Sequence, residues 1–539
     1  MALSTWADAL QQNPNAKTVL TAFVVVAALA FTYRLLTTSQ ANSQLPVWAP
    51  LEIGLTRHLL PRRGRGYRLL SALRRKDGSL FGLTSKHQML IDPPQVDRLM
   101  AHSASSISSA PVQYTIATRV FGCTHSPAVE EQFYASCEEL TAPVGKLFLN
   151  DAAATAALGR ADIPQQVQSF VSFSSDPEHM KLWERSANLK VTTTADGVQK
   201  VEADFQSLVR DFGACIAIPQ LYGRDFLERY PQVLSDLWKF DNDLFPLMMI
   251  GIPRWAPLKI VKDGVAAQSR IHAGLEGLYR RVGQYQKGQP IDFDADMSDI
   301  SDVVVSRHNT YEKYGWPIRQ QGELELGLLW GQNANTQPVV FWLLTYVYSK
   351  PDLLKQLREE TSPYLTMSET TPRELVALDI AGVGKGCQLL KACVFETYRL
   401  VNDVTSLRHV SRPITHTEGG LKHELAANTF LSALLSLANH DPSVYSDPES
   451  FDPTRFLEQS ASTGKPAARY GKLKPWGAGA AMCKGRTFAE KEIMSLAVAI
   501  MSMWDIAPAS SKWELPERVP GTGVQKPVKD IRVVITRRQ

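Results

Sequence analysis

The stretch KPWGAGAAMCKGR, residues 474 to 486, surrounds one cysteine with glycine and alanine. Cys483 is followed by Lys484, Gly485 and Arg486, so few bulky side chains shield the thiol and two basic ones lie beside it. A thiolate persists in such a positive setting, and a glycine-rich loop can bring backbone N–H groups up to the sulfur. An incidental cysteine in a surface turn is the alternative. The rest of the sequence favours a thiolate that binds a large group.

The composition is that of a globular protein, with 44% hydrophobic and 21% charged residues among 539. The net charge of +4 is small for this length and indicates no nucleic-acid-binding surface. The six cysteines are widely spaced and form no CxxC pair, which argues against a disulfide framework or a zinc site. Five of them are expected to be reduced, buried small hydrophobes: Cys123, Cys137, Cys215, Cys387 and Cys393.

An apolar segment near the N-terminus predicts a membrane anchor. Residues 18–36 carry one charge, Arg34, and as a helix would span about 28 Å, close to the thickness of a bilayer's hydrocarbon core. A cleaved signal peptide, which has a basic start and a shorter apolar core, and a buried core helix are the alternatives. The flank that follows is rich in arginine, so the positive-inside rule predicts a cytosolic C-terminal part. Residues 1–17 are then a tail and residues 37–50 a linker.

The body, residues 51–539, shows mostly helical patterns with few strand-like runs. Residues 389–401 predict one helix, and residues 323–350 predict a longer apolar helix that is interrupted near Asn335 and Pro338. Strands are predicted at residues 409–414, 430–437 (which suit a helix equally well) and 530–537. The body is therefore predicted to be mainly α with small peripheral β-sheets.

Three separated signatures follow one another along the chain. Glu396 and Arg399 stand at positions i and i+3 of a predicted helix and face the same way. Arg455 follows in a proline-containing loop, residues 447–456. The cysteine loop comes last, with Trp476, Gly479 and Gly485 at offsets of −7, −4 and +2 from Cys483.

This order and spacing resembles the cytochrome P450 superfamily, over about the whole body after the anchor. The resemblance implies the P450 fold and a heme b whose iron takes the Cys483 thiolate as its axial ligand. It also implies that Glu396, Arg399 and Arg455 interlock as a buried charge cluster beneath the haem. Backbone donors around the sulfur would then tune the iron.

Two positions depart from the family pattern, in which phenylalanine is usual at −7 and a basic residue at −2. Here Trp476 and Ala481 occupy them. Trp476 is expected to pack beside the sulfur, and Gly479 and Gly485 to let the loop approach the porphyrin. Arg408 matches a family position that binds a haem propionate. The tryptophan makes the chain most similar to the branch that contains sterol 7α-hydroxylases and prostacyclin synthase, with fungal relatives.

Asn335 and Thr336 stand where family hydroxylases place an acid–threonine pair that delivers protons. The resemblance implies catalytic roles for both, with the acid replaced by an amide that holds water but cannot cycle a carboxyl proton. Pro338 removes a backbone N–H and loosens this turn. The alternative is that both side chains bond back to helix carbonyls.

The presence of Thr336 favours a monooxygenase, which hydroxylates or epoxidises its substrate, over an isomerase of the prostacyclin-synthase kind. Because anchor and haem domain fill the chain, we expect electrons to come from a separate NADPH-cytochrome P450 reductase, with cytochrome b5 as an alternative donor. Basic residues near the cysteine suit an acidic flavoprotein, although they are equally compatible with a solvated surface: Lys472, Lys474, Lys484 and Arg486.

The anchor and the apolar distal helix predict a lipophilic substrate such as a sterol, a terpenoid or another secondary metabolite. They also predict a single-pass protein of the endoplasmic reticulum membrane with its catalytic domain in the cytosol. Four segments are expected to form the pocket walls: residues 110–125, 323–338, 404–407 and 521–523. A membrane-anchored haem-binding protein without turnover is the alternative from another class.

Overall fold

The computed structural model describes residues 44–59, 80–84, 86–90, 93–460, 464–519, 521 and 523–539. The predicted tail, the predicted transmembrane helix at residues 18–36 and the first part of the predicted linker lie outside these ranges. Across the described ranges, no helix has both the length and the apolar character needed to cross a bilayer.

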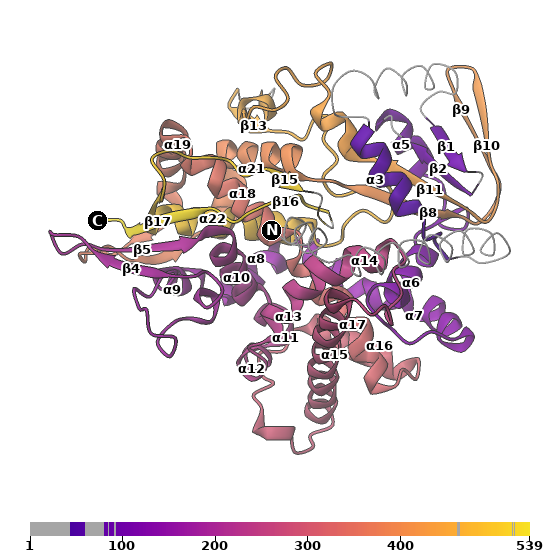
Figure 1. Ribbon diagram of the computed structural model, residues 1–539, viewed down its shortest axis with the longest axis horizontal. Helices are drawn as coiled ribbons and strands as arrows, with labels where there is room; N and C mark the ends of the chain where they lie inside the picture. The colour runs from indigo at the N-terminus through magenta and orange to yellow at the C-terminus, as the bar shows by residue number, and fades with distance from the viewer. Residues whose placement is uncertain are drawn as a thin grey trace, which may run out of the picture.

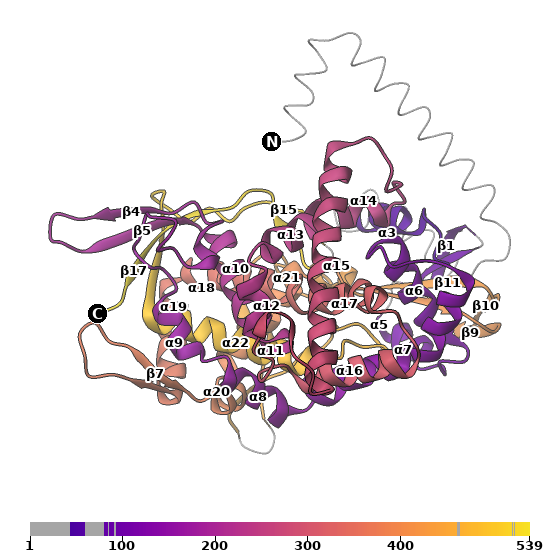
Figure 2. The same cartoon turned by 90° about the horizontal axis from the view of Figure 1, so that it is seen from below.

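Helices make up most of the body, and the long α15 crosses it beside α17 (Figures 1 and 2). The helices are α3 (Ala49–Leu59), α5 (Pro93–Met100), α6 (Ala110–Arg119), α7 (Pro127–Phe148), α8 (Asp151–Arg160), α9 (Ile163–Gln168), α10 (Phe205–Ala217), α11 (Pro219–Tyr222), α12 (Arg224–Arg229), α13 (Val233–Lys239), α14 (Phe245–Met249), α15 (Lys259–Gln286), α16 (Asp302–Lys313), α17 (Ile318–Asn333), α18 (Thr336–Tyr348), α19 (Pro351–Thr361), α20 (Ile380–Gly386), α21 (Gln388–Val401) and α22 (Arg486–Met503). Short helical turns include η2 (Phe240–Leu244), η5 (Leu435–His440) and η6 (Pro453–Phe456).

The sheets are small and lie at the periphery of the helical body (Figure 1). The largest has the order β1-β2-β11-β8-β3, in which β2 and β11 run parallel and the other pairs antiparallel. Its strands are β1 (Leu80–Thr84), β2 (His87–Leu90), β3 (Ile107–Ser108), β8 (Thr405–Val410) and β11 (Thr429–Leu434). A second sheet has the order β14-β17-β5-β4, from β4 (Lys190–Thr193), β5 (Gln199–Asp204), β14 (Trp504–Pro508) and β17 (Arg532–Arg537).

Two-stranded pairs complete the described strands: β6 (Leu365–Met367) with β7 (Leu375–Leu378), β9 (Ile414–Glu418) with β10 (Leu421–Leu425), β12 (Leu457–Gln459) with β13 (Pro466–Ala468) and β15 (Arg518–Val519) with β16 (Lys526–Pro527). The prediction of a mainly helical body with small peripheral sheets is therefore confirmed.

Most local predictions match the structure. The long apolar helix breaks where expected, since α17 ends at Asn333 and α18 begins at Thr336. The strand predicted at residues 409–414 is wrong at its centre, because β8 ends at Val410 and β9 begins only at Ile414. Pro413 between them has no N–H to donate to a ladder.

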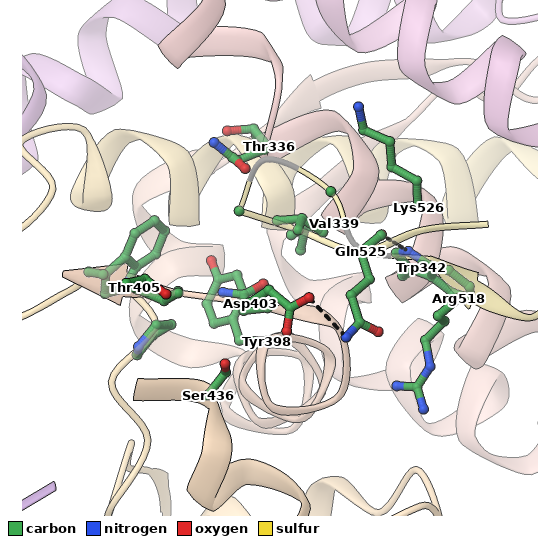
Figure 3. A pocket seen from close by; sticks show the side chains of 18 of the residues that line it. Thr336, Val339, Trp342, Tyr398, Asp403, Thr405, Ser436, Arg518, Gln525 and Lys526 are labelled. Atoms are coloured by element: carbon green, nitrogen blue, oxygen red, sulfur yellow. Dashed lines mark hydrogen bonds between the residues drawn. The ribbon is translucent and has the colours of Figure 1, made fainter. Parts of the chain in front are cut away.

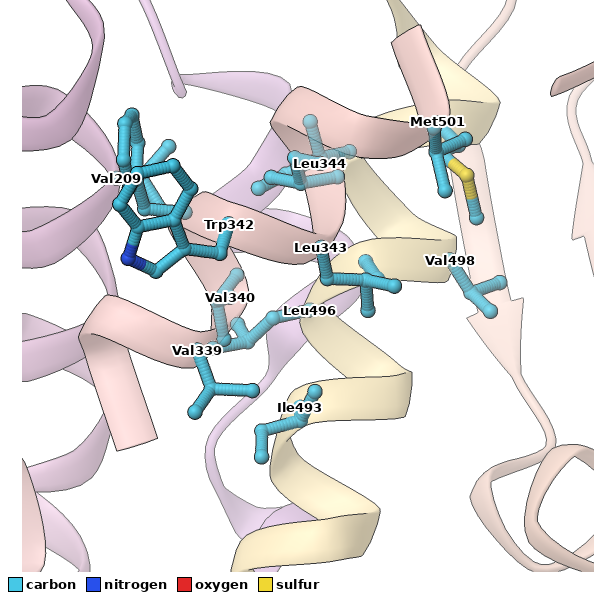
Figure 4. Packing of buried hydrophobic residues seen from close by; sticks show 14 of the residues in the cluster. Val209, Val339, Val340, Trp342, Leu343, Leu344, Ile493, Leu496, Val498 and Met501 are labelled. Carbon is cyan, nitrogen blue, oxygen red and sulfur yellow. The ribbon is translucent and has the colours of Figure 1, made fainter. Parts of the chain in front are cut away.

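The packing of α18 against α22 fixes the relative positions of the two helix starts that meet at the site. Every residue of α18 is buried, as expected for a helix that is apolar all round. Val340 and Leu343 lie in one core with Ile493 and Leu496 of α22, and Val209 of α10 joins the same core (Figure 4). This core holds the start of α18 in place relative to the start of α22, which directly follows the cysteine loop.

Candidate active site

A cavity of about 3070 Å³ lies between α18, the cysteine loop and β8. A typical small-molecule pocket has roughly 300–1,000 Å³, so this one has room for a large prosthetic group together with a substrate. Cys483, Trp476 and Gly485 line it from the cysteine loop, and Asn335 and Thr336 line it from the break between α17 and α18. In Figure 3, Thr336 and Val339 lie on one side of the cavity, opposite Tyr398 and Ser436.

All four segments predicted as pocket walls contribute lining residues, among them Ile116, Trp330, Leu407 and Gly521. Other lining residues come from α10, from η2 and from β16, which the sequence did not indicate: Gln206, Arg210, Asp241 and Lys526. Lys526 forms an ion pair with the buried carboxylate of Asp241, which also accepts a hydrogen bond of 2.9 Å from the Trp330 indole. These polar and charged residues belong to no apolar sequence pattern that could have marked them as pocket residues.

The cysteine loop is closed by its own backbone. The N–H of Cys483 donates to the carbonyl of Trp476 at 2.9 Å, and the N–H of Met482 donates to that of Gly479 at 3.1 Å. Gly479 has a φ of +71°, and a Cβ there would lie 2.4 Å from the carbonyl oxygen of Met100 at the end of α5. Gly479 is thus required by the contact with α5, and it does not line the cavity, whereas Gly485 does.

The Cys483 thiol is exposed to the cavity. Desolvation by the surrounding protein raises its pKa, and the backbone N–H groups of Gly485 and Arg486 and the charges of Arg486 and Lys484 counteract that rise. Burial raises the pKa of each of the other five cysteines, and none of those five lines this cavity. Among the six cysteines, Cys483 alone combines access to the cavity with two cationic neighbours.

Trp476 takes part in a hydrogen-bonded chain that a phenylalanine could not form. Its indole N–H donates to the hydroxyl of Tyr470 at 2.9 Å, and that hydroxyl donates to Glu490 at 2.5 Å. Glu490 in turn pairs with Lys391 at 2.8 Å. The indole also packs edge-on against the ring of Tyr398, with ring centroids 5.2 Å apart. The side chain at this family-atypical position is therefore held in one orientation.

The structure brings Glu396, Arg399 and Arg455 together. Arg399 binds Glu396 through two hydrogen bonds of 2.7 Å, and the Nε of Arg455 lies 3.3 Å from the same carboxylate. Both Glu396 and Arg399 are fully buried, and Arg399 also donates to three carbonyls, those of Asn439, Pro448 and Ser450. The cluster stands behind the cavity wall and ties α21 to the chain between η5 and η6.

Arg408 is a buried cation that has no carboxylate partner among the described residues. Its guanidinium donates to the carbonyls of Leu407 at 2.7 Å and Ala478 at 2.8 Å, so it clamps β8 to the cysteine loop. Burial lowers the pKa of Arg408, because no described anion compensates its charge. Arg408 does not itself line the cavity, although its neighbour Leu407 does.

The side chains of Asn335 and Thr336 do not bond back to helix carbonyls. Asn333 makes such a bond, from its amide to the carbonyl of Leu329 at 2.9 Å. The Oδ1 of Asn335 is buried without a partner among the described residues, and the Thr336 hydroxyl likewise makes no hydrogen bond with them. A Cβ at Gly523 would lie 2.5 Å from that Oδ1, so the loop before β16 closes over it. Both side chains are free to bind water or a ligand in the cavity.

Comparison with known proteins finds a likeness to one family. The cytochrome P450 family model matches residues 324–533, which contain the helix break, the charge cluster and the cysteine loop. The structure of retinoic acid bound cyanobacterial CYP120A1 superposes with a TM-score of 0.59 at 16% identity, over 90% of this chain and 96% of that one, and so shares the fold. This chain is similar to the cytochrome P450 superfamily in sequence over residues 324–533 and in fold over most of its length.

Curated P450 relatives are distant. A cytochrome P450 monooxygenase of Gibberella zeae is 26% identical over 59% of this chain and 59% of its own length. The 25-hydroxycholesterol 7-alpha-hydroxylase of Rattus norvegicus is 25% identical over 59% of this chain and 74% of its own length. The match thus spans about six tenths of the first of these relatives. The predicted resemblance to the sterol 7α-hydroxylase branch and its fungal relatives is confirmed.

P450 proteins are haem-thiolate enzymes, and the residues of this cavity fit that group. The donor is a cavity-facing thiol with cationic neighbours, and Arg408, next to the lining residue Leu407, is a buried cation without a carboxylate partner among the described residues. Buried polar atoms without a partner among the described residues also lie along the wall: the hydroxyl of Tyr398 and the amide oxygens of Asn335 and Asn402. Water or the polar edges of a bound group can satisfy them.

Proposed function

We propose that this protein is a monooxygenase that hydroxylates or epoxidises a lipophilic substrate with O2 and with electrons from a separate NADPH-dependent reductase. The observation that carries the proposal is the free hydroxyl of Thr336, which faces the same cavity as the Cys483 thiol. An isomerase of the prostacyclin-synthase kind needs no such proton-handling group. The monooxygenase relatives support the same reaction class.

Each part of the site has a physical task in this reaction. When bound, the haem supplies the iron centre at which O2 is activated. Cys483 would hold it as a thiolate, Arg408 would neutralise a propionate, and Trp476 would pack beside the sulfur. Thr336 and the amide of Asn335 would hold water at the break between α17 and α18, where the Thr336 hydroxyl can pass a proton on.

The cavity wall supports a lipophilic substrate with some polar groups. Its lining is predominantly apolar on the side of α6, α14 and α17, where Ile116, Phe245 and Leu328 lie. The Asp241–Lys526 pair adds charged groups to the same wall. Sterols, terpenoids and related secondary metabolites combine an apolar body with few hydroxyl groups, and the sterol hydroxylases among the relatives agree with this class.

We also propose that the reductase docks on the face that carries the cysteine loop. Lys472 is exposed there, and Lys484 and Arg486 fold back on the carbonyls of Ala480 and Cys483 but keep their charge. Lys474 is paired with Asp97 at 2.8 Å, so its charge contributes less. An acidic flavoprotein, with cytochrome b5 as an alternative, suits such a surface.

The membrane placement belongs to the same proposal: a tail at residues 1–17, a transmembrane helix at 18–36, a linker at 37–50 and a cytosolic haem domain at 51–539, in the endoplasmic reticulum. Exposed apolar side chains support it. Trp255 is 81% exposed, Ile260 44% and Leu51 39%. The loop that contains Trp255 packs through Gly251 against Val47, which belongs to the predicted linker at residues 37–50. These side chains would suit a lipid headgroup region.

Turnover in microsomes tests the proposal. The protein is expressed with and without a P450 reductase and supplied with a lipid extract, and products are detected by mass spectrometry as a gain of oxygen. Oxygenated product that requires both NADPH and reductase supports the monooxygenase. Rearranged product that requires neither shows an isomerase, and haem binding without any product shows a haem protein without turnover.

A further inference from the structure

Two histidines face each other on the hairpin β9–β10, at the edge of the molecule (Figure 1). The strands run antiparallel, and His416 of β9 stands directly opposite His423 of β10. They are joined by Gly419 and Gly420, whose φ values of +52° and +87° belong to a two-residue hairpin turn. Such a turn fixes the register of the strands, so His416 and His423, the histidine pair, are held as neighbours.

Each imidazole of the histidine pair has a buried nitrogen that needs a partner. His416 is 6% exposed, because it lies on the same buried face of β9 as Ile414, and His423 is half-buried. The Nε2 atoms of both rings make no hydrogen bond with the described residues. The rings stack, with centroids 6.3 Å apart and planes inclined by 29°. Buried polar atoms are normally satisfied, so these two nitrogens indicate a shared partner from outside the polypeptide.

The histidine pair is separate from the active site. Neither residue lines the large cavity. Ile414 and Leu425, which pair at the open end of the hairpin, belong to a core that also contains Met100 of α5 and Ala478 of the cysteine loop. A ligand that joins the two histidines would therefore brace the hairpin beside this core without entering the cavity.

The groups around His416 favour a neutral imidazole. Burial lowers the pKa of His416 most, and the neighbouring His423 lowers it further. Glu418 on the same strand raises this pKa, whereas His102 and Arg98, from the end of α5 and the turn that follows it, lower it. A neutral imidazole has the unprotonated ring nitrogen that a metal ion binds.

Imidazole nitrogens select one class of metal ion. They suit Zn²⁺, Cu²⁺ and Ni²⁺, while Mg²⁺ and Ca²⁺ prefer oxygen ligands. Two metal–nitrogen bonds of about 2.0–2.1 Å span at most about 4 Å between the nitrogens. Directly opposite residues of a hairpin have Cβ atoms about 4.5–5.5 Å apart, which lets two imidazoles reach one ion. The described part of the chain gathers no group of three or more histidine, cysteine or acidic side chains suited to a metal, so water would complete the coordination.

We propose that the histidine pair binds a divalent transition-metal ion, Zn²⁺ or Cu²⁺, through the Nε2 atoms of His416 and His423. The ion takes two ligands from the protein and the others from water, so the site is open and exchanges its metal. Because the ion binds the folded hairpin better than the unfolded chain, it stabilises the hairpin. The site does not depend on the proposed monooxygenase activity.

Zinc titration of the full-length, haem-loaded protein tests the site. The protein is purified without a histidine tag and titrated calorimetrically with Zn²⁺ and, as the control ion, with Mg²⁺. Wild type should bind Zn²⁺ but not Mg²⁺. His416→Ala and His423→Ala should each weaken Zn²⁺ binding by at least about tenfold, because even groups that only orient a metal ligand contribute about 10–100-fold. His423→Ala, at the half-buried position, decides the question if His416→Ala does not fold.

His179→Ala is the matched control. His179 is exposed, and its Nδ1 lies 2.9 Å from Oδ2 of Asp176, so it has the composition of an adventitious zinc site outside the hairpin. This variant should keep the wild-type affinity. Zinc X-ray absorption of the one-to-one complex should show two imidazole nitrogens at about 2.0–2.1 Å beside oxygen ligands. A wild type that does not bind Zn²⁺, or an affinity that His423→Ala leaves unchanged, would overturn the proposal.

Discussion

The guanidinium of Arg399 binds the carboxylate of Glu396 through two parallel hydrogen bonds, Nε to Oε2 and Nη2 to Oε1, each 2.7 Å long. Both side chains are fully buried. The backbone N–H of Asp452 adds a third donor at 3.0 Å, and Arg455 adds a second cation. These buried groups compensate one another's charges and hydrogen bonds in the absence of water. The loss of any member therefore leaves a buried charge without compensation.

Glu396→Ala should therefore lower the free energy of unfolding by about 3–5 kcal/mol and leave much of the protein without haem. Chemical denaturation and the haem-to-protein absorbance ratio measure both effects. Glu424→Ala is the control, because Glu424 pairs with Lys422 at 3.0 Å on an exposed hairpin and should change little. A stable, fully haem-loaded Glu396→Ala protein would show that the cluster behaves as a surface ion pair.

Trp476→Phe should cost stability through the lost hydrogen bond to Tyr470. The expected loss is about 0.5–1.5 kcal/mol, the net value of one hydrogen bond, with a further loss from the smaller ring. A double-mutant cycle with Tyr470→Phe isolates the interaction, and the double variant should be less destabilised than the sum of the two singles. Strict additivity would mean that the two side chains do not interact in solution.

The pH dependence of stability should report the buried acid Glu492. Its pKa rises from 4.5 in the unfolded chain to about 8 in the folded protein, so the folded protein binds more protons between these values. The free energy of unfolding then contains a contribution that is present at low pH and is lost as the pH rises through about 8. The stability of wild type relative to Glu492→Gln should accordingly fall between about pH 5 and about pH 8 in thermal unfolding. A flat difference over this range would contradict a raised pKa.

Thr336→Ala should uncouple electron use from product formation. The proposed relay depends on this hydroxyl and on water, since Asn335 beside it cannot cycle a proton, and general acid–base groups contribute typically 10²–10⁴-fold. We expect product formation to fall by roughly one to three orders of magnitude, while NADPH is consumed and hydrogen peroxide is released. Thr345→Ala is the control on the same helix, because the Thr345 hydroxyl bonds back to the Phe341 carbonyl. Unchanged coupling in Thr336→Ala would exclude the relay.

The parts of the site that could be predicted from sequence are those that depend on short-range patterns. The break before Thr336 follows from polar residues and Pro338 inside an apolar run, and α18 indeed begins there. The i, i+3 spacing of Glu396 and Arg399 places both on one side of α21, where they pair. Such features need a few residues in one helix, and the local physics decides them.

The parts that could not be predicted depend on contacts between distant segments. Glycine is required at position 479 because a Cβ there would collide with the backbone of Met100, 379 residues earlier in the chain. Glu492 reads as an ordinary helical glutamate, and only its burial in the folded protein raises its pKa, against the lowering effect of the Gln337 amide, 155 residues away. Burial and long-range partners shift a pKa, and neither is encoded in local spacing. The anchor at residues 18–36 stays a prediction.

The central claim is that Cys483 is the thiolate ligand of a haem. The most direct measurement is the absorption spectrum of the reduced protein with carbon monoxide. Wild type should show the strongly red-shifted Soret band of thiolate ligation, and Cys137→Ala, which changes a half-buried cysteine outside the cavity, should keep it. Cys483→Ala should lose this band. A Cys483→Ala protein that retains the red-shifted band would contradict the account.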